Sequence, residues 1–272
     1  MVNTELSINP YMAKKVLKKD HSDVEQIHIS PGHTLPKVIK RIKFKSINQK
    51  RYYDAIEHPE TNIIMAQAVA GVGKTFISIQ KGIEMLLDKT SDINKLIIIN
   101  PTVDVGNEDK LGYLPGTLME KIGFHAESAL FILHKIIGEV ETQKLVDKKK
   151  LEFRVLNFLR GINFENAYVI LDEAQNTSPL QLKTLLTRIS DDCKMIVQGD
   201  LTQTDKFKLN GHQDYEKSGF YDVWKRLGGV QGVHQIEFNK DDCVRSNIVR
   251  RVLEAYETDN AIILGEKNYL DI

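Results

Sequence analysis

Cysteine is nearly absent from this chain, because Cys193 and Cys243 are its only two among 272 residues. Two cysteines are too few for a disulfide framework or a thiolate metal site, so we expect a reducing, cytoplasmic compartment. No apolar run approaches the ~20 residues that a membrane-spanning helix needs. The first ten residues have no basic stretch followed by an apolar one, so a secretory signal is not expected either. These absences predict a soluble protein without a membrane partner.

Net charge is also absent. Lysine plus arginine number 37, and so do aspartate plus glutamate, so overall charge predicts no polyanionic partner and any nucleic-acid surface must be local. One local candidate is residues 37–51, which contain seven cations and no acid: Lys37, Lys40, Arg41, Lys43, Lys45, Lys50 and Arg51. This run is interpreted either as a solvated arm over the main domain or as a contact region for a phosphate backbone.

Three regions follow from the hydrophobic pattern. Residues 1–45 lack regular periodicity and contain Pro and Gly breakers, so we expect a short N-terminal extension. Residues 46–260 form the expected main domain, and residues 261–272 form a tail. Within the main domain, apolar runs predict strands near 62–66, 95–99, 151–156, 168–171, 193–197 and 233–238. Helical patterns alternate with them at 74–87, 117–150, from 179 onward and at 241–256.

This alternation predicts an α/β fold with three layers and a doubly wound, mostly parallel sheet. Ligands of such sheets bind beyond the carboxyl ends of the strands. Residues 68–75, Ala-Val-Ala-Gly-Val-Gly-Lys-Thr, lie at one of these ends, between an expected strand and an expected helix, which is the context of a phosphate-binding P-loop. The expected nucleotide-binding residues there are Ala70, Gly71, Val72, Gly73, Lys74, Thr75 and Phe76.

The chemistry of this loop explains its residue types. Glycines let the backbone N–H groups approach phosphate closely, and the helix N-terminus adds partial positive charge. Lys74 is expected to reach the β- and γ-phosphates, and the Thr75 hydroxyl to bind Mg²⁺. Ala68 stands where the pattern has its first glycine, and an alanine is tolerated there if its φ is negative.

Polar residues end two further strands. Asp172 and Glu173 follow the apolar run Tyr168 to Leu171, an arrangement that suits Mg²⁺ binding by Asp172 and polarisation of the attacking water by Glu173. Gln203 follows the next strand and could sense the γ-phosphate or that water. Each segment alone could also be an ordinary polar turn, but the P-loop upstream favours the catalytic interpretation.

Together these segments resemble the PhoH-like ATPases. The similarity lies in residues 70–75, 100–103, 111–116, 159–161, 170–177, 199–203 and 242–257, and it spans roughly residues 47 to 257. That family looks like the first motor domain of superfamily 1 helicases, a RecA-like fold. The resemblance implies that Asp172 and Glu173 form the Walker B pair and that Gln203 belongs to a helicase-type motif III. It also makes Asn48 and Gln49 similar to the motif that reads adenine, so that ATP would be preferred to GTP.

Related helicases close the ATP site with arginines from a second RecA-like domain. Here the sequence ends about 15 residues after the family-like region, so we expect a neighbouring subunit to supply the arginine. The expected assembly is a homo-oligomer, with a hexameric ring as its form. Arg245 is the first candidate for this arginine and Arg160 the second, although either residue could instead form a surface ion pair.

Three functions compete on the sequence. The favoured one is an ATPase motor that acts on RNA or single-stranded DNA, because the motif set is helicase-like. The second is an ATP-dependent regulatory or assembly module without unwinding activity, which the neutral net charge permits. A small-molecule kinase shares the P-loop, but the chain has no obvious arginine-rich lid.

Overall fold

The computed structural model describes residues 39, 42–69, 71–101, 118–156, 159, 161–203, 208–209, 212–213 and 217–244. Three residues singled out in the sequence, Ala70, Arg160 and Arg245, lie outside these ranges, as do the expected tail and all but a few residues of the N-terminal extension.

One sheet of six parallel strands forms the centre of the domain, in the order β3-β2-β4-β5-β1-β8. Every residue of β4 and of β5 is buried, as expected for parallel strands that are covered on both faces. The predicted α/β class with a doubly wound parallel sheet is therefore confirmed. The strands are β1 (Ile63–Gln67), β2 (Lys95–Asn100), β3 (Leu151–Val155), β4 (Ala167–Leu171), β5 (Lys194–Gly199) and β8 (Val233–Glu237).

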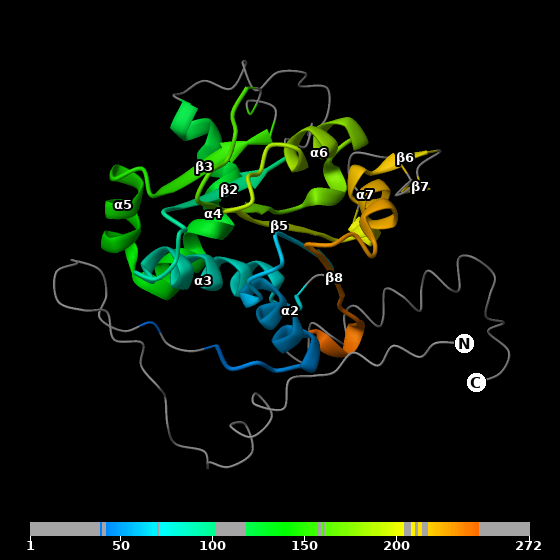
Figure 1. Cartoon of the computed structure of the whole chain (residues 1–272), viewed down its shortest axis with the longest axis horizontal. Helices are drawn as coiled ribbons and strands as arrows, with labels where there is room; N and C mark the ends of the chain where they lie inside the picture. Colours follow the sequence, from blue (N-terminus) through cyan, green and yellow to red (C-terminus); the bar gives the residue numbers. More distant parts are fainter. Residues whose placement is uncertain are drawn as a thin grey trace, which may run out of the picture.

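Helices cover the two faces of this sheet (Figure 1). Successive strand residues point to opposite faces, so Ile64 and Ile196 pack in one apolar cluster whereas Met65 and Val197 pack in the other. One face is covered by α2 (Ile47–Glu57), α3 (Lys74–Leu87), α4 (Leu118–Ile137) and α5 (Glu139–Asp147), and the other by α6 (Pro179–Leu186) and α7 (Gly219–Leu227). The remaining short elements are η3 (Ala174–Asn176), η4 (Leu201–Gln203), β6 (Lys208–Leu209), β7 (His212–Gln213) and η6 (Lys240–Asp242).

Local capping explains where two of these helices begin. The predicted start of α6 is confirmed: the Ser178 hydroxyl accepts from the Gln181 N–H, the Gln181 side chain accepts from the Ser178 N–H, and Pro179 occupies the first turn. A cap of this kind contributes about 1 kcal/mol. Helix α2 was not expected from the sequence. Its N-cap is Ser46, whose hydroxyl accepts from the Gln49 N–H at 3.2 Å.

Two helical predictions need revision or stay open. The pattern over 117–150 predicts one helical stretch, but Gly138 at φ +82° separates α4 from α5, and Val140 is 67% exposed instead of joining the core. In the segment 241–256, η6 ends at Asp242, and residues from 245 onward lie outside the described part. α4 has 20 residues, but neither it nor another helix within the described ranges is long and apolar enough to cross a membrane.

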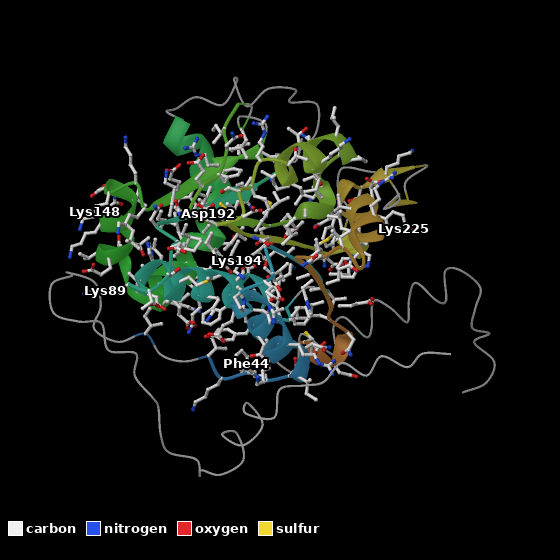
Figure 2. The ribbon with its side chains drawn as sticks, viewed as in Figure 1. Phe44, Lys89, Lys148, Asp192, Lys194 and Lys225 are labelled. Atoms are coloured by element: carbon white, nitrogen blue, oxygen red, sulfur yellow. The ribbon has the colours of Figure 1, made fainter. Side chains whose placement is uncertain are left out.

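A buried lysine joins β5 to the end of α2. Lys194 is 8% exposed, and its Nζ donates to the backbone oxygens of His58 and Thr61. Figure 2 shows it near the middle of the molecule, whereas Lys89, Lys148 and Lys225 lie toward the outside. Burial lowers the pKa of Lys194 to about 8, and the charge of Lys81 acts in the same direction.

We expect Lys194→Met to remove a pH-dependent part of the stability. Between the folded pKa of about 8 and the ordinary lysine pKa of about 10.4, the unfolded chain binds more protons than the folded one, so the Lys194 contribution to the free energy of unfolding rises with pH. Urea unfolding of both proteins near pH 7.5 and near pH 9.5 measures it. The wild type should gain about 2 kcal/mol relative to the variant between these two pH values. An equal difference at both pH values contradicts the prediction.

Candidate active site

The P-loop connects β1 to α3. Gly71 and Gly73 have φ values of +87° and +83°, which a residue with a side chain adopts only with strain, and Gly73 is the N-cap of α3 without a side-chain cap bond. The first N–H groups of α3 therefore lack intrahelical partners and suit an anion. Ala68 is fully buried, does not have a positive φ, and donates its N–H to the Gly199 oxygen at 3.0 Å. This is the condition under which alanine is tolerated there.

The structure brings Thr75 and Asp172 together, although they are 97 positions apart in the sequence. The Thr75 hydroxyl donates to Asp172 Oδ2 at 2.9 Å, and Asp172 Oδ1 accepts from the backbone N–H of Glu173 at 3.0 Å. They meet because β1 and β4 are both neighbours of β5 and end at the same edge of the sheet. A hydroxyl and a carboxylate at this place are the oxygen donors that Mg²⁺ prefers, so the residues fit the ion.

Glu173 lies in a strained and partly buried turn. Its φ of +55° is left-handed and uncommon for a residue that is not glycine. Burial raises the pKa of the Glu173 carboxyl above its ordinary value, and the charge of Asp172 raises it further. The Gln175 amide and the Lys74 cation oppose this rise in pKa. Glu173 is therefore a stronger base than an exposed glutamate.

Gln175 connects the ends of β4 and β5. This fully buried side chain donates from Nε2 to Glu173 Oε2 at 2.6 Å and to the Gln203 backbone oxygen at 3.3 Å. Its Oε1 accepts from the Asp200 N–H at 3.0 Å. A Cβ at Gly199 would lie 2.6 Å from Gln175 Oε1, so this close approach requires glycine. The backbone of Gln203 thus joins the site, whereas its side chain is exposed.

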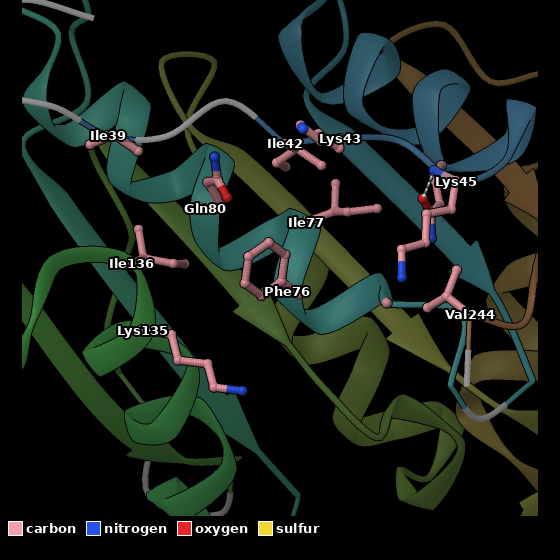
Figure 3. A pocket seen from close by; sticks show the side chains of 12 residues that line it. Ile39, Ile42, Lys43, Lys45, Phe76, Ile77, Gln80, Lys135, Ile136 and Val244 are labelled. Carbon is pink, nitrogen blue, oxygen red and sulfur yellow. Dashed lines mark hydrogen bonds between the residues drawn. The ribbon is translucent and has the colours of Figure 1, made fainter. Parts of the chain in front are cut away.

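A cavity of about 640 Å³ lies beside the P-loop, between α3, α4 and the segment before α2. Figure 3 shows the Phe76 ring in the middle of this cavity, with Lys135 of α4 on one side and Lys43 and Lys45 on the opposite side. Gln49 also lines it. Its Nε2 donates to the Val72 oxygen at 2.8 Å and its Oε1 accepts from the Lys45 N–H at 2.7 Å. The structure thus places Gln49 and Phe76 next to the P-loop.

The described part of the cation run does not form one separate basic surface. Lys43 and Lys45 line the cavity. Lys50 pairs with Asp54 one turn along α2. Arg51 donates to the Asn48 side chain at 3.3 Å. Both interpretations of residues 37–51, a solvated arm and a contact region for a phosphate backbone, therefore stay predictions.

The last described residues also reach the P-loop. The Val244 N–H donates to the Gly71 oxygen at 3.1 Å. Two positions earlier, Asp242 is 4% exposed and its Oδ2 accepts from Asn48 Nδ2 at 2.8 Å. The residue that precedes Arg245 in the sequence therefore contacts the loop that would bind phosphate.

The family model described as PhoH-like protein matches residues 41–257 of this chain. The chain belongs to this family. It is 35% identical over 221 residues to the PhoH-like protein of Bacillus subtilis (strain 168), covering 81% of this chain and 66% of that protein. It is 37% identical over 216 residues to the PhoH-like protein of Synechocystis sp. (strain ATCC 27184 / PCC 6803 / Kazusa), covering 79% and 62%. The chain thus spans slightly less than two thirds of the length of these curated relatives.

Among solved structures, the large terminase of bacteriophage HK97 is similar with a TM-score of 0.46 and 13% identity, over 78% of this chain and 47% of that one. The family identified from the motifs is confirmed, and the PhoH-like chain has an α/β domain with a six-stranded parallel sheet and a P-loop between β1 and α3.

Two participants in the site were missed in the sequence. Gln175 lies within residues 170–177, which carry part of the family resemblance, but the sequence alone assigns it no role. The sequence alone also assigns no role to Gln198, whose Nε2 donates to Thr75 Oγ1 at 3.2 Å. A signal for Gln198 existed, since it is an amide in a strand that is apolar from Met195 to Val197.

Proposed function

We propose that this PhoH-like chain binds ATP together with Mg²⁺ and hydrolyses it. The observation that carries the proposal is the 2.9 Å hydrogen bond from the Thr75 hydroxyl to Asp172 at the N-terminus of α3, with Glu173 directly beside it. A Gly-rich strand-to-helix turn without a ligand has no need of this carboxylate pair. We assign the activity to residues 46–260, with residues 1–45 as an extension and 261–272 as a tail.

Binding uses the residues of the loop and of the adjacent cavity. The backbone N–H groups from Ala70 to Phe76 would receive the phosphates, and Lys74 would neutralise part of their charge. We place the adenine in the cavity beside Gln49, whose amide then exchanges its present bonds to Val72 and Lys45 for the base. This placement favours ATP over GTP.

Hydrolysis uses the residues at the ends of β4 and β5. Thr75 and Asp172 would hold Mg²⁺, which neutralises charge on the phosphate oxygens when it is bound. Glu173 accepts a proton from the attacking water, a role for which its raised pKa suits it. Gln203 orients the water or senses the γ-phosphate, and Gln175 connects it to Glu173.

A transition-state arginine completes the proposal. In the described part of the chain, the arginines are engaged elsewhere: Arg51 with Asn48, Arg154 with Glu152, Arg188 with the Ile162 oxygen and Arg226 with Asp222. We propose that Arg245, or Arg160 in its place, acts on the site of a neighbouring subunit. The assembly is then a homo-oligomer, with a hexameric ring as the expected form.

We further propose that hydrolysis is coupled to RNA or single-stranded DNA, as in a helicase-type motor. The support is the connection between Glu173, Gln175 and Gln203, which joins the hydrolytic carboxylate to the motif III segment. The alternative is an ATP-dependent regulatory or assembly module without unwinding activity. Its support is the neutral net charge and the use of Lys43 and Lys45 at the cavity.

We expect ATP turnover to rise several-fold when RNA or single-stranded DNA is added, and the stimulation to weaken at higher salt because phosphate contacts release counterions. Turnover is measured with each nucleic acid at low and high salt, with GTP as the control nucleotide and EDTA as the control for Mg²⁺. Turnover that does not change with nucleic acid favours the regulatory module. Absence of any turnover contradicts the ATPase proposal itself.

A further inference from the structure

Two polar side chains lie deep in the apolar layer between the sheet and α2. Gln198 of β5 and Tyr52 of α2 are both 0% exposed. Tyr52 belongs to the apolar cluster on this face, and its ring packs edge-on against Phe238 with the ring centroids 5.6 Å apart. Burial of an amide and a phenol costs free energy unless both find hydrogen-bond partners. The hydrogen-bond partners of Gln198 and Tyr52 therefore determine whether the burial of these two groups is tolerated.

These partners form a chain that ends at the nucleotide loop. The Tyr52 hydroxyl donates to Gln198 Oε1 at 2.9 Å, and Gln198 Nε2 donates to Thr75 Oγ1 at 3.2 Å. Thr75 in turn donates to Asp172. Burial, and to a smaller extent the charge of Asp172, raises the pKa of Tyr52 well above its ordinary value, so its hydroxyl remains a donor.

The chain of bonds defines what remains free on the Thr75 hydroxyl. A hydroxyl has one hydrogen to donate and two lone pairs to accept with. The hydrogen is directed to Asp172, and one lone pair receives the Gln198 N–H. Within the described part of the chain the second lone pair has no partner, and its direction is fixed by the other two bonds. That lone pair is the one available to a divalent cation.

We propose that Gln198, held by Tyr52, is a positioning residue that orients the Thr75 hydroxyl for Mg²⁺. The inference rests on the proposed function, since it concerns the same nucleotide site. Gln198 does not contact the cation or the nucleotide in this proposal but acts through Thr75. It stands directly before the segment from Gly199 to Gln203, so β5 connects both that segment and the metal-binding hydroxyl to the core.

The test measures how much Mg²⁺ the variant Gln198→Met needs for nucleotide binding. Methionine is similar to glutamine in length and volume, but it forms neither the bond to Tyr52 nor the bond to Thr75. Binding of a fluorescent ATP analogue is titrated with Mg²⁺, and also measured in EDTA. We expect the half-saturating Mg²⁺ concentration to rise about tenfold, as when a residue behind a metal ligand is lost. Binding in EDTA should stay unchanged. A merely structural role would weaken both kinds of binding together.

Tyr52→Phe separates the effects of the two bonds in this relay, the one from Tyr52 to Gln198 and the one from Gln198 to Thr75. It removes the support of Gln198 but keeps the Gln198–Thr75 bond, so we expect a smaller rise of about two- to threefold in the Mg²⁺ requirement. The matched control is Tyr168→Phe, which removes an equally buried phenol whose hydroxyl donates to the Ser78 oxygen at 3.0 Å and not to Gln198. Its Mg²⁺ requirement should equal that of the wild type.

The outcomes distinguish the relay from the function on which it rests. If the half-saturating Mg²⁺ concentration of Gln198→Met equals that of the wild type, the positioning role of Gln198 is overturned while the proposed function stands. If Gln198→Met does not fold, an unchanged requirement in Tyr52→Phe overturns the relay. A wild-type protein that binds no nucleotide overturns the proposed function, and this inference with it.

Discussion

Glu173→Gln should lower ATP turnover by on the order of 10³-fold while ATP binding stays within about twofold of the wild type. The amide has almost the shape of the carboxylate but cannot accept a proton from water. The Gln175 side chain, which now donates to Glu173 Oε2, can still donate to the amide oxygen, so the turn should persist. The loss is therefore expected in the chemical step and not in binding.

The measurement is single-turnover hydrolysis together with the affinity for ATP, both with Mg²⁺ present. Glu60→Gln is the matched control, because Glu60 is an exposed glutamate outside the site. Its turnover should equal that of the wild type. Turnover of Glu173→Gln within tenfold of the wild type would show that Glu173 does not act on the water.

Arg245→Ala should reduce turnover about 10³-fold and spare ATP binding if Arg245 stabilises charge in the transition state. Lys74→Ala should be equally inactive because it disrupts phosphate binding in its own subunit. If the arginine acts across a subunit interface, mixing the two inactive variants restores activity. In a randomly mixed ring, about a quarter of the sites pair an intact Lys74 with a neighbour's intact Arg245.

Turnover of the mixture near a quarter of the wild-type value therefore supports action between subunits. No recovery would place the arginine in its own subunit, where the preceding residue, Val244, donates its N–H to the Gly71 oxygen. Near-normal turnover of Arg245→Ala alone falsifies the assignment and directs the same experiment to Arg160. Arg226→Ala is the control, since Arg226 pairs with Asp222 on the surface of α7. Native mass of the same samples tests the ring.

Local chemistry made much of this domain predictable from the sequence. The strands from Ile63 and from Ala167 are apolar runs that only a covered sheet accommodates, and the start of α6 follows from the cap at Ser178. The P-loop and the pair Asp172–Glu173 combine residue types that few purposes besides phosphate chemistry require together. Each of these features depends on residues that are close together in the sequence, so each can be predicted from the sequence alone.

Helix α2 and the break at Gly138 could not be predicted from local sequence, and each has its own physical cause. Helix α2 has a low apolar content, and its burial depends on β8, β1 and α3 packing against it. The break at Gly138 interrupts an apolar spacing that continues through Val140, because a glycine with positive φ outweighs the periodicity. Periodicity also does not show which side chain a buried residue faces.

The sequence by itself determined the fold class and the family, and it predicted the residues that would touch nucleotide. Only the tertiary structure decided that β5 lies between β1 and β4, so that Thr75, Asp172 and Gln198 form one network, which Glu173 extends to Gln175. The physical reason is that the lateral order of parallel strands is set by long-range packing. Hydrogen bonds between buried polar side chains follow from that order, because each must find whatever partner the neighbouring strand or helix presents.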